Sequence, residues 1–327
     1  MLRLLLLLSL IVSGQSCEES PKLKAIGGKP NEALRKLVAN NTDPYVFMED
    51  REFADTPEPP PAEPAEPGEP KKPAAKPAAA VVPGIFNKDC WAAPLDLSGI
   101  PWHTGISGAA ITRRHVVTAA HWNNLPPSVR YQSRDGKTVN VSHLPADPED
   151  HPDFKQTRMT VPDRPACWIH LGNDVAIATT AKPLPESIAV YPLPAPLPEG
   201  MENQLIGRTV LSTHWSDENH QPDPRGLRIA GLRKVARFAG QTIAFAQEPE
   251  LPGDLYFSAV VGDSGNPLFF VNPSSNKLIL VSTFTGGGGG SGPYYGSAAI
   301  QQNIRKYSAA SPAPDERFTT TDLTSDD

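Results

Sequence analysis

Short apolar runs separated by turn residues dominate the chain from residue 84 onward. Gly, Pro, Asn and Asp bound these runs, and no long helical periodicity interrupts them before residue 297. Runs of this kind predict strands, and many short strands between turns predict an all-β domain, which we place at residues 84–309. The predicted strands are 108–111, 115–119, 137–141, 175–179, 205–212, 227–236, 242–246, 267–271 and 277–284.

Two segments show helical spacing of apolar residues. They are 31–38, with Leu34, Leu37 and Val38 on one face, and 297–307, with Ile300, Ile304 and Tyr307 on one face. The first lies in a polar N-terminal segment, residues 17–56, that has too few apolar residues to fold alone. The second predicts a C-terminal helix packed on the β-domain.

Three further segments are not predicted to belong to the packed domain. Residues 1–16 have a basic start and then an apolar run, which predicts an export signal too short to span a bilayer. Residues 57–83 are dense in proline and predict an extended linker. Residues 310–327 predict an acidic, disordered tail. We therefore expect an exported protein, periplasmic or extracellular.

Composition narrows the class of partner. The 327 residues carry a net charge of −6 and 37 prolines. Without basic blocks, the chain has no predicted surface for nucleic acid or anionic lipid. An odd cysteine count in an exported protein has two explanations for Cys17: it is lipidated as the first mature residue, or it leaves with the signal. Either way Cys90 and Cys167 remain as a predicted disulfide pair.

The stretch 260–267 carries the first candidate chemistry. It places Ser264 between glycines, after Asp263 and directly before an apolar strand. Glycines let a backbone turn sharply, so the N–H groups of Gly262 and Ser264 can converge on one point. Two converging N–H groups form an oxyanion hole for a carbonyl that Ser264 attacks.

Two upstream stretches supply partners for this serine. His121 ends the apolar stretch 116–121, and Asp174 opens the strand predicted at 175–179. A serine hydroxyl needs a base to become nucleophilic, and a carboxylate orients a histidine in that task. We predict that His121, Asp174 and Ser264 form a catalytic triad.

The motifs Thr-Ala-Ala-His at 118–121, Asp-Val-Ala at 174–176 and Gly-Asp-Ser-Gly-Asn-Pro at 262–267 resemble those of trypsin/chymotrypsin-like serine proteases. The resemblance covers residues 84–309 and indicates a divergent, exported, bacterial-type member. It implies two packed six-stranded antiparallel β-barrels with a C-terminal helix. It also implies a serine-type endopeptidase that forms an acyl-enzyme, acts on protein or peptide substrates and needs no metal or organic cofactor.

The sequence departs from the family pattern at several positions. The disulfide that brackets the catalytic histidine is absent, since Ser107 and Trp122 stand where its cysteines are expected. Asn266 replaces a glycine. In the family, the residue matching Asp263 pairs with a newly cleaved N-terminal amine, for which a start at Val81 has the right spacing but a poor local sequence.

The resemblance also gives a substrate pocket that includes Ser258, Ser282 and Phe284. Ser258 stands where members that prefer Lys or Arg carry a carboxylate, so a basic substrate side chain is disfavoured. Phe284 narrows the pocket, and Ser282 is expected to hydrogen-bond to Asp174. His214 and His220 lack the spacing of metal ligands, and we predict no metal site.

Two rival functions remain open. One is a catalytically inactive, trypsin-fold binding or scaffold protein, and the other is an esterase-like acyl hydrolase with the same triad. We expect attachment to a membrane only through a lipid on Cys17.

Overall fold

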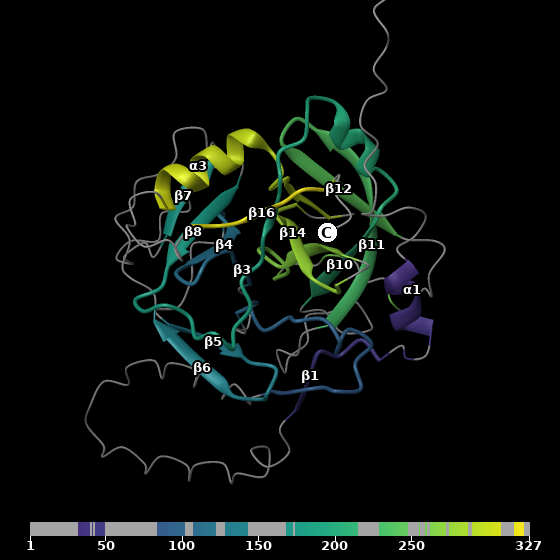
Figure 1. Ribbon diagram of the computed structural model, residues 1–327, viewed down its shortest axis with the longest axis vertical. Helices are drawn as coiled ribbons and strands as arrows, with labels where there is room; N and C mark the ends of the chain where they lie inside the picture. The colour runs from purple at the N-terminus through teal and green to yellow at the C-terminus, as the bar shows by residue number, and fades with distance from the viewer. Residues whose placement is uncertain are drawn as a thin grey trace, which may run out of the picture.

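The computed structural model describes residues 32–39, 41, 43–49, 84–101, 107–121, 128–142, 168–172, 174–214, 229–247, 255, 259, 262–272, 275–286, 290–308 and 317–323. Several sequence predictions lie outside these residues: the export signal, the proline-rich linker, Cys17, Trp122, Cys167 and Ser258. Within the described part the protein is mostly β, with few helices (Figure 1).

The largest sheet, here called the large sheet, is a curled half-barrel of six strands. Its strands in spatial order are β14 (Leu278–Thr283), β13 (Pro267–Val271), β10 (Thr209–His214), β11 (Ile229–Ala239), β12 (Thr242–Gln247) and β15 (Ser291–Pro293). The curl brings its two edges together, because the Tyr295 N–H just beyond β15 donates to the Val281 carbonyl oxygen in β14 at 2.9 Å.

Alternation along β13 explains why this sheet is apolar on both faces. Leu268 and Phe270 pack in the concave core of the large sheet, whereas Phe269 and Val271 pack in a different core that reaches the other half of the molecule. Successive side chains of a strand point to opposite faces. An uninterrupted apolar run is therefore what a strand covered on both sides requires.

The other half of the molecule contains the first sheet, four strands in the order β3 (Ala109–Ala110), β4 (His115–Ala119), β8 (Val175–Thr179) and β7 (Trp168–Gly172). A separate hairpin, β5 (Ser128–Gln132) with β6 (Thr138–Ser142), packs on it. Val116 and Ala176 of the sheet share a core with Val129 and Tyr131 of the hairpin. The described strands on this side form a sheet of four and a hairpin of two, so the expected closure into a six-stranded barrel stays a prediction.

The opposite face of the first sheet joins the two halves. Val117 and Ile177 lie in one core with Leu211 and Leu280 of the large sheet. Helix α3 (Ala298–Ser308) follows the large sheet in the chain but lies against β7 of the first sheet (Figure 1). The C-terminal helix therefore bridges the halves.

The N-terminal segment packs on this body. Helix α1 (Glu32–Ala39) buries Leu34 and Val38, and β1 (Phe47–Glu49) pairs with β2 (Gly84–Phe86). The Ala230 N–H of β11 donates to the Pro44 carbonyl oxygen at 2.8 Å. A segment too polar to fold alone thus adds its few apolar side chains to the main core.

The predicted disordered tail is wrong for residues 317–323. Strand β16 (Thr320–Thr321) pairs in parallel with β9 (Leu193–Pro194), and Leu323 is fully buried in the core of the large sheet. The tail is acidic overall, but burial of Leu323 anchors residues 317–323 to the large sheet.

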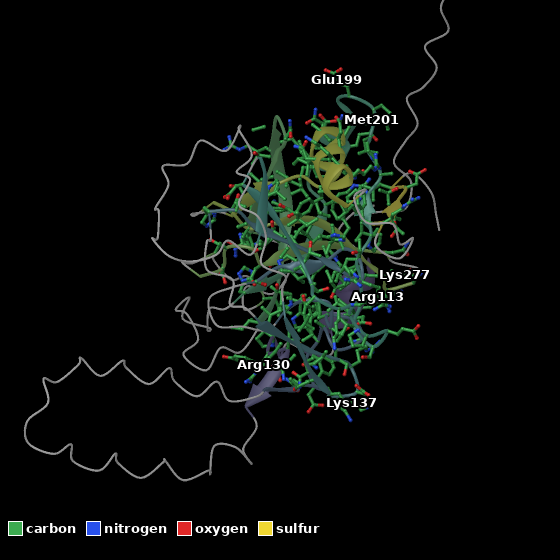
Figure 2. All side chains as sticks on the ribbon, turned by 90° about the vertical axis from the view of Figure 1, so that its left-hand side faces the viewer. Arg113, Arg130, Lys137, Glu199, Met201 and Lys277 are labelled. Carbon is green, nitrogen blue, oxygen red and sulfur yellow. The ribbon has the colours of Figure 1, made fainter. Side chains whose placement is uncertain are left out.

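Side chains at the two ends of the molecule belong to different parts of the fold. In Figure 2, Glu199 and Met201 lie at one end, at the turn that contains the 3-10 helix η1 (Met201–Leu205). Arg130 and Lys137 lie at the other end, on the β5–β6 hairpin. Among the described residues, none of the helices combines the length and apolar character that a membrane span requires.

Candidate active site

Pairing of β4 with β8 brings His121 and Asp174 together. Ala119, the last residue of β4, is opposite Val175, the first residue of β8, so the residues that flank these strands are neighbours. The Ala120 N–H donates to the Asp174 carbonyl oxygen at 2.8 Å. Asp174 has a φ of 61°, a left-handed conformation that aspartate tolerates better than most residues.

The Asp174 carboxylate binds His121 through both oxygens. Oδ1 accepts the His121 backbone N–H at 2.7 Å, and Oδ2 lies 2.7 Å from the ring Nδ1. A carboxylate only accepts hydrogen bonds, so the ring proton resides on Nδ1 and Nε2 is left as an acceptor. The two side chains are 19% and 20% exposed, which leaves the pair within reach of a substrate.

Ser264 reaches this pair from the other half of the molecule. Its Oγ lies 2.7 Å from His121 Nε2. The turn that carries it precedes β13 and is tied to the end of β14, because the Gly265 N–H donates to the Phe284 carbonyl oxygen at 2.8 Å and the Phe284 N–H donates to the Asn266 carbonyl oxygen at 2.9 Å. The serine is thus fixed by the large sheet and the histidine by the first sheet.

Gly265 allows this close approach of the two halves. A Cβ at this position would lie 2.3 Å from the Ser107 carbonyl oxygen and 2.4 Å from Thr118 Oγ1, and its φ is +82°. Both the space and the backbone conformation exclude a side chain. Ser107, which by the family resemblance stands near the position of an absent cysteine, therefore contributes its backbone to the contact.

Gly262 and Ser264 have backbone N–H groups available for an acceptor. Among the hydrogen bonds of the described residues, none is donated by either of these two groups. Gly262 has a φ of +107°, which explains why glycine is needed in the turn. Their role as oxyanion donors stays a prediction.

Asp263, between these two residues, is buried and fully bonded. Its Oδ2 lies 3.2 Å from Nδ1 of the buried His214, and its Oδ1 accepts the Asn266 side-chain amide at 2.9 Å. Ser212 Oγ lies 2.7 Å from the other nitrogen of His214. Asn266 thus acts as a hydrogen-bond donor to Asp263, and its φ is not among the positive ones.

His214 is the residue whose role the sequence did not reveal. The sequence suggests only a metal ligand at this position, but Nε2 of the ring faces Ser212 and Nδ1 faces Asp263. Its Ser-x-His spacing on β10 puts it on the same face as Ser212, and that spacing was the available signal. In the described part of the chain, no three His, Cys, Asp or Glu side chains are grouped to hold a metal.

Two of the predicted pocket residues, Ser282 and Phe284, are buried. Ser282 Oγ donates to the Thr283 carbonyl oxygen at 3.3 Å, not to Asp174 as expected. The Phe284 ring is 1% exposed and lies between the His214 ring, 5.3 Å away, and the Arg233 guanidinium, 4.9 Å away. Both residues lie beside the Ser264 turn, but their role in substrate binding stays a prediction.

A buried tyrosine lies behind the histidine–aspartate pair. Burial raises the pKa of the Tyr295 phenol, and the negative charge of Asp174 raises it further, although the hydrogen bond between its hydroxyl and that of Thr283, 2.9 Å long, has the opposite effect. Tyr295 therefore stays neutral and adds no second negative charge near Asp174.

The predicted Cys90–Cys167 disulfide is not formed at Cys90. Cys90 is a free thiol buried in the main core, and Cys167 lies outside the described residues. Burial raises the pKa of Cys90 to about 12, so the thiol is protonated at neutral pH. Its sulfur accepts the Ala92 N–H at 3.4 Å within the local turn.

A search of protein-family models gives no match to this chain, and a search of curated proteins gives none either. What can be said of function therefore comes from the geometry of the site and from the sequence motifs.

Proposed function

We propose that this chain is a serine endopeptidase of the chymotrypsin-like type, with His121, Asp174 and Ser264 as its triad. The observation that carries the proposal is the continuous chain of hydrogen bonds from Asp174 through His121 to Ser264, with 2.7 Å at each step. Partial exposure of the histidine and aspartate supports a reactive rather than a structural role.

The proposed reaction starts with attack of Ser264 Oγ on the carbonyl carbon of a peptide bond. His121 Nε2 takes the hydroxyl proton and later gives it to the leaving amine, while Asp174 stabilises the imidazolium through Nδ1. Water then attacks the acyl-enzyme with His121 again as the base. The first proton transfer joins Ser264 Oγ and His121 Nε2, which already lie 2.7 Å apart.

The negative oxygen of the tetrahedral intermediate would be bound by the N–H groups of Gly262 and Ser264. Among the described residues, no hydrogen bond between these donors and another group would have to break for an oxyanion to bind. Preorganised donors of this kind contribute about 10²–10³ to the rate.

The arrangement of strands supports the two-barrel architecture as part of this proposal. The first sheet and the β5–β6 hairpin surround one core, and together they supply six strands. The large sheet supplies another six and curls until its edges meet. His121 and Asp174 come from the first group and Ser264 from the second.

We also propose that substrates with Lys or Arg at the cleaved position are poor ones. By the family resemblance, Ser258 stands where members that prefer Lys or Arg carry a carboxylate, so a basic substrate side chain would have no buried counter-charge.

A fluorophosphonate probe tests the proposal, because it reacts only with a serine activated by its base and oxyanion donors. Wild-type protein is expected to be labelled at one site, and Ser264→Ala is expected to abolish labelling. Ser275→Ala removes an exposed serine from the β13–β14 turn and serves as the matched control, with labelling unchanged.

Lack of labelling in the wild type would overturn the proposal and favour a binding or scaffold protein. Labelling with turnover of esters but not of peptides would overturn the peptidase assignment and favour an esterase-like hydrolase.

A further inference from the structure

The residue that precedes the candidate nucleophile belongs to a second Ser–His–Asp set. Asp263 is 1% exposed and His214 is 0% exposed. The His214 ring lies 3.2 Å from Asp263 Oδ2 and 2.7 Å from Ser212 Oγ. No substrate reaches side chains buried to this extent, so the set has a role other than catalysis.

Burial makes the position of Asp263 depend on its partners. An ionised carboxylate removed from water costs several kcal/mol unless opposite charge and hydrogen bonds compensate. His214 supplies a donor from β10, and Asn266 supplies one from the turn itself at 2.9 Å. The carboxylate is thus held in one place by both oxygens.

That position fixes the backbone on which the proposed chemistry depends. Asp263 separates Gly262 from Ser264, the two predicted oxyanion donors, and its own carbonyl oxygen accepts the Asn266 N–H at 2.9 Å. A rotation of the Asp263 peptide units would turn one or both donors away. Asp263 therefore couples a buried contact to the direction of the oxyanion donors.

We propose that His214 is a positioning residue that holds the oxyanion hole in its working form, so that no N-terminal cleavage is needed to assemble the site. This inference rests on the proposed function. In the family that the motifs resemble, the residue matching Asp263 pairs with a newly cleaved amine. His214 and Asn266 occupy both carboxylate oxygens instead, and an incoming amine would have to displace one of them.

The contacts of Gly84 and Asn87, the first described stretch after Val81, support the same conclusion. Gly84, three residues after Val81, is paired with Glu49 in the β1–β2 ladder, and the Asn87 N–H donates to the Val46 carbonyl oxygen at 2.9 Å. The described residues Gly84 and Asn87 are therefore held by the N-terminal segment.

The surroundings of His214 determine which variants are informative. Asp263 faces the ring from the turn, Ser212 from β10 and Phe284 from the end of β14, and Arg233 of β11 lies against the same Phe284 ring. The essential feature is a donor at the position of Nδ1. Asn can present an amide there, whereas Leu has a similar shape and no donor.

The experiment measures the rate of fluorophosphonate labelling in full chains of wild type, His214→Asn and His214→Leu, with Ser264→Ala as the blank. We expect His214→Leu to be labelled at least about a hundredfold more slowly, the effect of losing an oxyanion donor. We expect His214→Asn to stay within about tenfold of wild type. The intact mass of labelled wild type should include residues before Val81.

Each outcome separates this inference from the proposed function. If wild type is not labelled, the proposed function fails. If wild type is labelled and folded His214→Leu is labelled equally fast, the function stands and the positioning role is wrong. Labelling confined to chains that begin at Val81 would also overturn the inference.

If His214→Leu does not fold, a comparison of His214→Gln with His214→Asn tests the same role. His214→Gln can keep a contact with Ser212 but cannot place a donor at Nδ1. Equal labelling of the Gln and Asn variants would overturn the proposal, and slow labelling of Gln alone would support it.

Discussion

The molecule contains two Ser–His–Asp sets that have almost the same internal distances and very different surroundings. In both, the histidine Nε2 lies 2.7 Å from a serine hydroxyl. In the set of His121 the carboxylate contact is 2.7 Å and the side chains are about one-fifth exposed, whereas in the set of His214 the contact is 3.2 Å and both side chains are buried.

The difference shows that access, and not residue type, decides what such a set can do. The His121 set joins two sheets, and its members can meet a substrate without unfolding. The His214 set lies within the large sheet and its turn, where the same groups can only hold one another. Since Asp263 and Ser264 are adjacent, one short turn connects the two sets.

Replacing the aspartate of each set by asparagine should show the largest difference between the two sets. Asp174→Asn leaves the His121 contacts in outline but favours the wrong tautomer, so we expect kcat to fall about 10⁴-fold with little change in stability. Asp263→Asn sets an amide against buried donors, so we expect the free energy of unfolding to fall by about 3 kcal/mol. Ester hydrolysis and urea unfolding measure the two effects.

Each variant is the control for the other. A large loss of stability in Asp174→Asn, or an unchanged unfolding midpoint in Asp263→Asn, would mean that burial does not distinguish the two sets.

Two glycines with the same φ of +82° test how the halves are held together. Gly265→Ala would place a Cβ 2.3 Å from the Ser107 carbonyl oxygen, whereas a Cβ at Gly200 meets nothing within 4 Å. Both variants carry the strain of a left-handed alanine, about 1–2 kcal/mol. Gly265→Ala adds overpacking of about 1–3 kcal/mol, and the displaced Ser264 should be labelled more slowly by the fluorophosphonate.

Thermal or urea unfolding of the two variants side by side measures the difference. Equal destabilisation, with labelling retained in Gly265→Ala, would show that the two halves do not depend on this contact to align Ser264 with His121.

Much of the fold was predictable where strands are apolar and end at turn residues. The predictions at 115–119, 175–179 and 267–271 are confirmed without change of bounds as β4, β8 and β13. Strand β5 was missed because Val129 and Tyr131, which lie in the core, are its only apolar residues, and the other three are polar. Strand β10 begins at Thr209 and not at 205, because a 3-10 helix runs to Leu205 and Gly207 turns the chain.

Some residues of the candidate site could likewise be predicted from local sequence, and others could not. His121, Asp174 and Ser264 could be named from local motifs, and the structure brings all three within hydrogen-bond distance. The partnership of His214 with Asp263 could not, because it depends on two segments 49 residues apart that meet only through the large sheet. Local sequence reports a residue's chemistry, but contacts across a sheet depend on the whole fold.

Cys90 gives a direct test of whether burial prevents a side chain of this protein from reacting, with the smallest expected effect on the protein. Its pKa is raised to about 12 by burial, so its thiol should not react with a disulfide reagent at pH 8 in the native state. A chain with Cys17→Ser and Cys167→Ser isolates this thiol. We expect no reaction until guanidinium is added, and then one equivalent. Reaction of the native chain would show that the core opens at Cys90.

The same shift predicts how stability depends on pH. The unfolded thiol ionises near its ordinary pKa of 9.0, whereas the folded thiol stays protonated up to about 12. Stability from this group is complete below pH 9 and is lost as the pH rises toward 12, with a fall of about 1.4 kcal/mol by pH 10. Urea unfolding at pH 8 and pH 10 measures it, and Cys90→Ala should remove this part of the slope. An identical slope in both chains would mean that the thiol ionises as easily in the folded core as in the unfolded chain.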